Sequence, residues 1–338
     1  MKRMITLFLV LAMAVGLLAG CGQQNEPTTS DETTLSVVTT IFPEYDWVRE
    51  ILGDKADNAE VTMLLDNGVD LHSYQPTADD IIKISDCDLF IYVGGESDGW
   101  VEDALKEATN KDMKVINLLE VLGDSVKEEE TVEGMQEEDH DYEDADEHDD
   151  AEEHDHEEEA EYDEHVWLSL RNAETLCDAI SSALQQIDPD NKDAYAANTS
   201  AYIKKLSALD ADYQATVDAA TYKTVLFGDR FPFRYMVDDY GLSYYAAFVG
   251  CSAETEASFE TISFLAGKVD ELNLPCVLTI EGAQHKIAET IVENTSTKNQ
   301  AILTMDSMQA TTSEDVKNGA TYLSIMEQNL SLLKEALG

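Results

Sequence analysis

An acidic tract rich in histidine ends at an apolar segment and is the strongest chemical signal in the chain. The tract spans 128–164 and carries almost no positive charge, and the segment DEHVWLSLRNA overlaps its end. Its histidines are His140, His148, His154 and His156. Carboxylates and imidazoles at this density repel each other when empty and bind divalent cations when filled. The tract therefore predicts an auxiliary metal-capture loop near a metal site, and its alternative is a solvated acidic linker.

Three side chains outside the tract are expected where strands end or where loops meet helices. His72 follows the apolar run 59–65, His165 follows the tract, and Asp306 directly follows the apolar run 301–305. Ligands of open α/β sheets bind beyond the carboxyl ends of the strands. Each residue alone is commonly a capping or surface group. Together, two imidazoles and a carboxylate suit zinc or manganese as metal ligands.

Other residues with metal-binding chemistry have simpler explanations. His285 and Glu281 suit a helix N-terminus, where capping and dipole effects favour them. Cys251 is expected in a loop and could bind zinc as a thiolate. The sequence leaves disulfide pairing open and shows no zinc-ribbon spacing among the cysteines after residue 21. These are Cys87, Cys177, Cys251 and Cys276.

Short apolar runs alternate with helical patterns along most of the chain. Strands are predicted at 35–41, 59–65, 88–93, 113–118, 223–227, 244–248, 276–280 and 301–305. Helices are predicted at 43–52, 77–84, 100–109, 171–187, 191–220, 233–238, 259–271, 286–293 and 313–336. This βα rhythm indicates an α/β fold with parallel-type sheets that helices flank.

The helical pattern at 191–220 is long enough to join two lobes. Residues 35–187 are predicted to form an N-terminal α/β lobe with the acidic loop inserted, and 222–338 a C-terminal α/β lobe. The linking helix is assigned to 188–221. One long rigid helix between two such lobes places the predicted metal site in the cleft between them.

The N-terminus predicts the location of the protein. Residues 1–20 have the basic start and apolar run of a signal peptide, and small residues precede Cys21, which is typical of a bacterial lipoprotein signal with lipid on the cysteine. Residues 21–34 indicate a flexible tether. The net charge of −49 excludes a nucleic-acid footprint. An extracytoplasmic protein, anchored to the membrane by lipid, is expected.

Nearly the whole mature chain resembles the metal-binding subunits of bacterial zinc and manganese ABC importers. The resemblance rests on TTIFPEYDWVREILGD, NGVDLHSYQPTADDIIKISDCDLFIYVGG, DEHVWLSLRNA, DPDNKDAYAANTSAYIKKLSALDADY and TYLSIMEQNL. It implies that His72 and His165 are metal ligands and that Asp306 is a further ligand. It also implies two α/β lobes joined by a long helix. The acidic loop before His165 resembles the zinc-selective subgroup.

One part of the sequence departs from this family. A third ligand, histidine or glutamate, is usual before a YGL turn, where this chain has VLFGDRFPFRYMVDDYGL. One alignment places Arg230 at the ligand position and another places Gly228 there, and neither residue binds a metal. Asp229 lies between them and is the candidate oxygen ligand. A site with three protein ligands and water, or with a tract histidine, is the alternative.

The preferred hypothesis is a monomeric binding protein, not an enzyme, that delivers zinc to an ABC permease. A manganese-binding subunit of the same type is one alternative. A secreted zinc metalloenzyme is another, although the sequence has no HExxH or GxSxG motif. A metal-buffering adhesin, active in cell adhesion, is the third.

Overall fold

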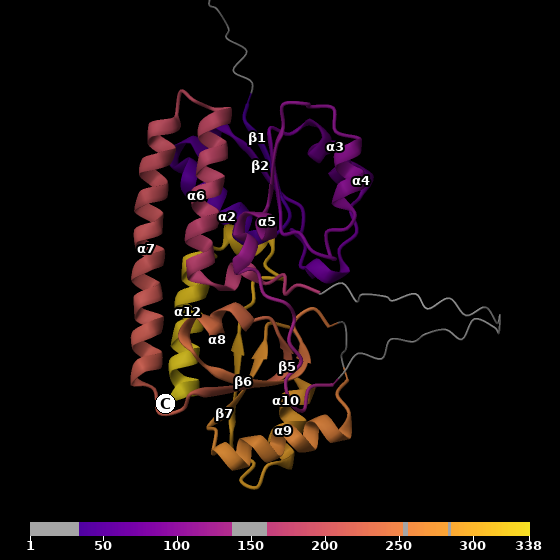
Figure 1. Cartoon of the computed structure of the whole chain (residues 1–338), viewed down its shortest axis with the longest axis vertical. Coiled ribbons are helices and arrows are strands. Elements are labelled where there is room, and N and C mark those ends of the chain that lie inside the picture. The colour runs from indigo at the N-terminus through magenta and orange to yellow at the C-terminus, as the bar shows by residue number, and fades with distance from the viewer. Residues whose placement is uncertain (1–33, 137–160, 253–255, 283–284) are drawn as a thin grey trace, which may run out of the picture. The chain divides into compact units, whose positions relative to one another are not determined.

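Two parallel four-stranded sheets form the framework of the protein (Figure 1). The computed structural model describes residues 34–136, 161–252, 256–282 and 285–338. The predicted signal peptide, Cys21 and the four tract histidines lie outside these residues. Leu35–Gly338 form one compact unit, so the predicted domain boundaries stay a prediction. Among the described helices, none has the length and apolarity needed to cross a membrane.

The first sheet has the strand order β2-β1-β3-β4, with every pairing parallel. Its strands are β1 (Ser36–Thr39), β2 (Glu60–Met63), β3 (Leu89–Tyr92) and β4 (Lys114–Asn117). The helices between and after them are α2 (Phe42–Leu52), α3 (Ala78–Asp86), α4 (Val101–Lys106) and α5 (Leu118–Leu122). Parallel neighbours place the carboxyl ends of all four strands at one edge of the sheet.

The second sheet repeats this topology with the order β6-β5-β7-β8. Its strands are β5 (Thr224–Phe231), β6 (Ser243–Val249), β7 (Cys276–Ile280) and β8 (Ala301–Met305). The helices of this region are α8 (Arg234–Tyr240), α9 (Phe259–Leu272), α10 (Lys286–Asn294), α11 (Ser313–Lys317) and α12 (Tyr322–Leu337). All eight predicted strands form, and the predicted α/β class with two parallel sheets is confirmed.

The helix α7 (Lys192–Ala219) connects the two halves, and α6 (Leu170–Ile187) precedes it. At about 1.5 Å per residue, the 28 residues of α7 extend about 42 Å. The helix packs against α2 of the first half and α12 of the second. Its predicted apolar face is buried, and it consists of Tyr195, Tyr202, Leu206, Leu209 and Tyr213. A shared apolar core along this helix fixes the relation of the two sheets.

The prediction of a single helix over 313–336 is wrong. The chain forms α11 and α12 instead, with a break at 318–321. Gly319 has φ of 101°, a left-handed conformation that favours glycine. Thr321 then caps α12 by accepting a hydrogen bond from the Ser324 N–H. The break lets Tyr322 enter the core, where its side chain is fully buried.

Tyr322 links α12 to the turn that follows His165. Its hydroxyl donates to the Trp167 carbonyl oxygen at 2.7 Å. Tyr322→Phe is expected to lower the free energy of unfolding by about 1–2 kcal/mol, because the buried carbonyl loses its partner. Denaturant unfolding measures this change. Tyr162→Phe, at an exposed tyrosine, is the matched control and should change stability by less than about 0.5 kcal/mol; equal effects would contradict the prediction.

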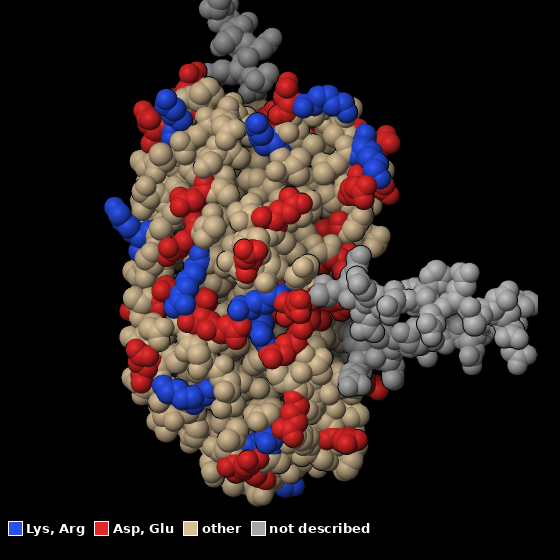
Figure 2. Space-filling model, viewed as in Figure 1, with Lys and Arg blue, Asp and Glu red and all other residues tan. Residues whose placement is uncertain are grey.

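On the face shown in Figure 2, acidic side chains are spread over the protein among fewer basic ones. This distribution agrees with the net charge of −49 for the whole chain. A field of this sign concentrates cations near the surface and repels polyanions.

Candidate metal centre

His72 lies in a short turn beyond the carboxyl end of β2. The turn is η2 (Leu71–Ser73), and Asp70 caps it by accepting a hydrogen bond from the His72 N–H at 3.0 Å. The imidazole is largely buried, with its side chain 10% exposed. The capped turn therefore fixes the direction in which the ring points.

His165 lies immediately before the turn η4 (Val166–Leu168) and is fully buried. One oxygen of Asp163, Oδ1, accepts from both the His165 backbone N–H and the ring Nδ1, each at 2.9 Å. The neighbouring Trp167 donates its ring N–H to the Ser307 carbonyl oxygen at 2.8 Å. The Trp167 contact ties the segment that carries His165 to the loop after β8.

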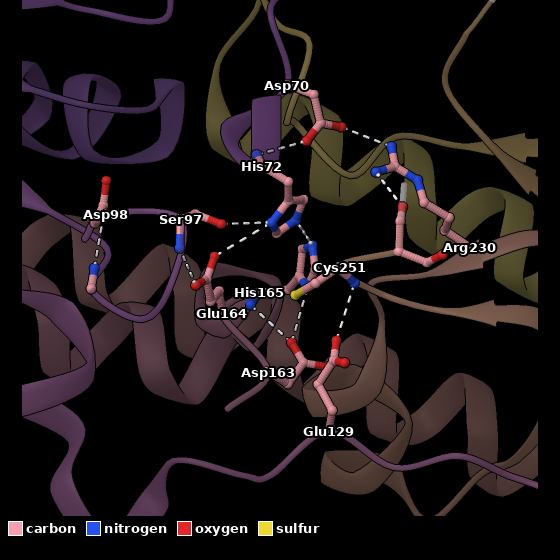
Figure 3. Close-up of polar contacts among 12 residues, drawn as sticks. Asp70, His72, Ser97, Asp98, Glu129, Asp163, Glu164, His165, Arg230 and Cys251 are labelled. Atoms are coloured by element: carbon pink, nitrogen blue, oxygen red, sulfur yellow. Dashed lines mark hydrogen bonds and ion pairs between the residues drawn. The ribbon is translucent and has the colours of Figure 1, made fainter. Parts of the chain in front are cut away.

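The two imidazoles meet through their Nε2 atoms, which are 3.2 Å apart (Figure 3). Two nitrogens bound to one tetrahedral zinc at about 2.0–2.1 Å lie about 3.3–3.4 Å from each other. The observed separation therefore matches the spacing of two ligands on a single ion. Histidines 93 positions apart in the sequence reach this geometry because two separate loops hold them.

Partners on the outer side of each ring favour hydrogen on Nδ1. His165 Nδ1 faces Asp163, while His72 Nδ1 lies 2.8 Å from Ser97 Oγ and 3.5 Å from Glu164 Oε2. With hydrogen on each Nδ1, both Nε2 lone pairs face each other. That arrangement is repulsive unless a cation lies between them. Carboxylates behind ligand imidazoles are the usual second layer of a zinc site.

Burial and the positive charge of a protonated His165 lower the pKa of His72 to about 3, so this ring is neutral at ordinary pH. Burial opposes protonation of His165 as well, but the Asp163 carboxylate outweighs it and raises the pKa of His165. Burial also raises the pKa of Glu164. The pair is therefore poised to hold one positive charge.

Cys251 completes a cluster of three candidate ligand atoms with His72 and His165. The three atoms all lie within 4.8 Å of one another. Cys251 is a free thiol in the turn after β6, so it comes from the second sheet. Within the described residues, no other group of three histidine, cysteine or acidic side chains meets this criterion.

Arg230 and Gly228 have roles other than metal binding. Arg230 Nη2 lies 2.7 Å from Asp70 Oδ2, and its Nη1 donates to the Ser252 carbonyl oxygen at 3.3 Å. Arg230 therefore ties the His72 turn to the Cys251 turn. At Gly228, a Cβ atom would lie 2.6 Å from Ala288 Cα, so close packing of α10 requires glycine there.

The two predicted carboxylate ligands lie outside the three-residue cluster. Asp229 accepts from the Arg230 N–H at 2.9 Å and from the Ile280 N–H at 3.4 Å, at the irregular end of β5. Asp306 follows β8 as predicted and accepts from the Met308 N–H at 2.7 Å. Burial and the charge of Glu281 raise the pKa of Asp306 to about 6. Gln309, in the same loop as Asp306, donates its side-chain N–H to Ser307 Oγ at 3.0 Å.

The other two candidates lie elsewhere. His285 is the residue before α10, where its side chain makes no capping hydrogen bond. Glu281 accepts hydrogen bonds from Ser307 and Gln309 and so shapes the loop after β8.

From the sequence, Asp229 is the candidate for the missing ligand and Cys251 is only a thiolate that could bind zinc, and Asp163 and Glu164 are not identified as partners of the histidines. A usable signal was present in each case. Cys251 follows a predicted strand next to the strand that carries Asp229, and parallel strands end at the same edge. The acidic pair directly precedes His165, and imidazole ligands commonly donate to a carboxylate.

The family model described as zinc-uptake complex component A, periplasmic, matches residues 37–336. The chain is 32% identical over 335 residues to the zinc-binding lipoprotein AdcA of Streptococcus pneumoniae, covering 99% of this chain and 61% of that protein. It is 31% identical over 338 residues to the high-affinity zinc uptake system protein ZnuA of Bacillus subtilis, covering 99% of this chain and 98% of the relative.

Among solved structures, the fold is similar to the Zn(II)-bound ZnuA-like domain of Streptococcus pneumoniae AdcA. The TM-score is 0.67 at 28% sequence identity, with 90% of this chain and 99% of that domain covered. The chain thus spans less than two thirds of the full pneumococcal protein and matches its ZnuA-like domain nearly completely.

Proposed function

The chain belongs to the family of periplasmic component A proteins of zinc-uptake complexes, and on this premise we propose that it captures zinc outside the cytoplasm and delivers it to an ABC permease. The relatives that it matches are named for zinc binding and zinc uptake. Zinc is therefore the proposed cargo, and manganese is the alternative that a titration must test.

The facing Nε2 atoms of His72 and His165 carry this proposal. Their separation of 3.2 Å suits two ligands of one tetrahedral zinc, and each ring has an outer partner at Nδ1. Asp306 is the proposed carboxylate ligand. Its loop is tied to the His165 segment by the hydrogen bond from the Trp167 ring N–H to the Ser307 carbonyl oxygen, and a bound cation would relieve the repulsion between Asp306 and Glu281. Asp229 is kept only as an alternative oxygen ligand.

The proposed location is the outer face of the cell membrane, with lipid on Cys21. One relative is named a lipoprotein, and the family description is periplasmic. The partner that receives the zinc would be the membrane-spanning subunit of an ABC importer. Capture outside the cell followed by transfer requires no chemical turnover.

The acidic tract is proposed to be an auxiliary metal-capture loop, not a part of the tight site. Replacing 137–160 by a Gly-Ser linker of about a dozen residues should change the affinity of the tight zinc site by less than about threefold. Any additional zinc that the full-length chain binds more weakly through the tract should no longer bind. Competitive titration with a zinc chelator, repeated with manganese, measures both effects.

The boundaries of this deletion follow from contacts of the flanking residues. Glu129 accepts from the Cys251 N–H at 3.1 Å, and Gln136 donates its N–H to the Ala247 carbonyl oxygen at 2.9 Å. A longer deletion over 128–162 removes these contacts and serves as the comparison. Loss of the tight site from the shorter deletion alone would show that the tract supplies a ligand.

Growth tests separate transport from the other hypotheses. Cells that lack this protein should grow poorly on scarce zinc and recover when zinc is added. Normal growth on scarce zinc would favour an adhesin or a metal buffer. Hydrolysis of generic ester or peptide substrates that is lost in His165→Ala would instead indicate a zinc metalloenzyme.

A further inference from the structure

We infer that Cys251 binds the captured metal as a thiolate and is the third protein ligand beside His72 and His165. The inference rests on the proposed function and names a ligand for the same site. Its basis is that the Cys251 sulfur and a ring nitrogen from each histidine all lie within 4.8 Å of one another. Figure 3 shows the sulfur beside the His165 ring.

The turn that carries Cys251 is packed directly on His165. At Gly250, a Cβ atom would lie 2.9 Å from His165 Cε1 and 3.0 Å from its Nδ1. Only glycine allows the backbone to approach the imidazole this closely. Gly250 therefore brings the next residue, Cys251, to the metal-binding side of the ring.

Contacts from both halves of the protein hold this turn in place. The Cys251 N–H donates to Glu129 Oε1 at 3.1 Å. On its other side, the Ser252 carbonyl oxygen accepts from Arg230, which also pairs with Asp70 beside His72. Two separate contacts, with Glu129 and with Arg230, therefore position the thiol, and the Arg230 contact connects it to the loop that carries His72.

Only a small movement is needed to form the site. In a tetrahedral zinc site, with Zn–S of about 2.3 Å and Zn–N of about 2.0–2.1 Å, sulfur and nitrogen lie about 3.5–3.6 Å apart. The three atoms already lie within 4.8 Å of one another. A shift of at most about 1.2 Å therefore brings the sulfur and the nitrogens to the spacing of a tetrahedral zinc site. As the sulfur–metal bond forms, the thiol loses its proton.

A thiolate ligand would affect which metal ion the site prefers. Thiolate sulfur favours zinc and other soft or borderline cations, whereas manganese prefers oxygen ligands. One thiolate and the Asp306 carboxylate would together neutralise a divalent zinc ion. Cys251 would therefore supply the third ligand that neither Arg230 nor Gly228 can provide.

Cobalt(II) is the probe that tests this ligand directly, on a chain beginning at residue 22. One equivalent of Co²⁺ should produce a thiolate-to-cobalt charge-transfer band in the near ultraviolet, which one equivalent of Zn²⁺ should abolish. Cys251→Ser should lose the band and weaken zinc binding by about a hundredfold, and Cys251→His should restore affinity without the band. Cys276→Ala, at a buried cysteine, is the matched control and should keep both the charge-transfer band and the zinc affinity.

A second readout uses the unaltered protein, so the test does not depend on the folding of a variant. Zinc should protect Cys251 from alkylation by iodoacetamide, measured by mass spectrometry. Absence of the band and of protection, with zinc still bound tightly through the histidines, would overturn the inference and leave the proposed function standing. Absence of tight zinc binding in the unaltered protein would overturn the proposed function itself.

Discussion

Replacing His165 by alanine is expected to weaken zinc binding by about a hundred- to a thousandfold, because a structural zinc site gains about 3–4 kcal/mol from each of its four ligands. His165 is fully buried and faces His72 across 3.2 Å, so no other described histidine can take its place. The loss should be measured by competition with a zinc chelator of known affinity.

Two further variants make this result interpretable. His72→Ala should produce a similar loss, and its more accessible position makes it the safer substitution for folding. His285→Ala removes a histidine outside the cluster and should leave zinc affinity within about threefold of the original. Unchanged affinity in a folded His165→Ala protein would refute the ligand assignment.

His72 and His165 were predictable because their positions depend on local pattern. His72 follows a predicted strand, and His165 lies where the tract meets a helix, so both were expected at one edge of a parallel sheet. The eight strands were predictable for the same reason, since short runs of buried apolar residues mark them. The apolar face of the long helix α7 followed from the 3.6-residue period.

The sequence signal places Cys251 only at the same sheet edge as Asp229, and the proximity of its sulfur to both histidines could not be predicted without tertiary structure. Its approach to His165 depends on the pairing of β6 with β5 and on the missing side chain at Gly250. The same limit applies to Arg230, whose contact with Asp70 joins residues 160 positions apart. The break at 318–321 was missed because helical periodicity continues across it, although Gly319 and the Thr321 cap were present in the sequence.

Zinc affinity is expected to fall by about a thousandfold when the pH is lowered from about 7.5 to about 5.5, because each proton displaced by the metal contributes about tenfold per pH unit. Burial and the charge of Glu129 raise the pKa of the Cys251 thiol, so zinc displaces its proton throughout this range. His72, with its pKa lowered to about 3, is already neutral, so zinc displaces no proton from it.

His165 adds a second proton once the pH falls below its raised pKa. Although burial opposes its protonation, the Asp163 carboxylate raises its pKa above the ordinary value of 6.5. Zinc must therefore displace a proton from His165 once the pH falls below this raised value. The slope of log zinc affinity against pH should then approach two, which corresponds to two protons displaced per zinc. Raising the pH reverses the effect, since both ligands then lose their protons more easily.

Calorimetric zinc titrations in buffers with different ionisation enthalpies count these protons at each pH. Cys251→Ser should reduce the count by one throughout, and Asp163→Asn should move the onset of the second proton to lower pH, because the carboxylate that favours the imidazolium is gone. A count of zero at pH 7.5 in the unaltered protein would contradict thiolate binding. A count that never exceeds one down to pH 5.5 would contradict the raised pKa of His165. Since both groups lie in one buried cluster, zinc affinity should fall most steeply once the pH is below the raised pKa of His165.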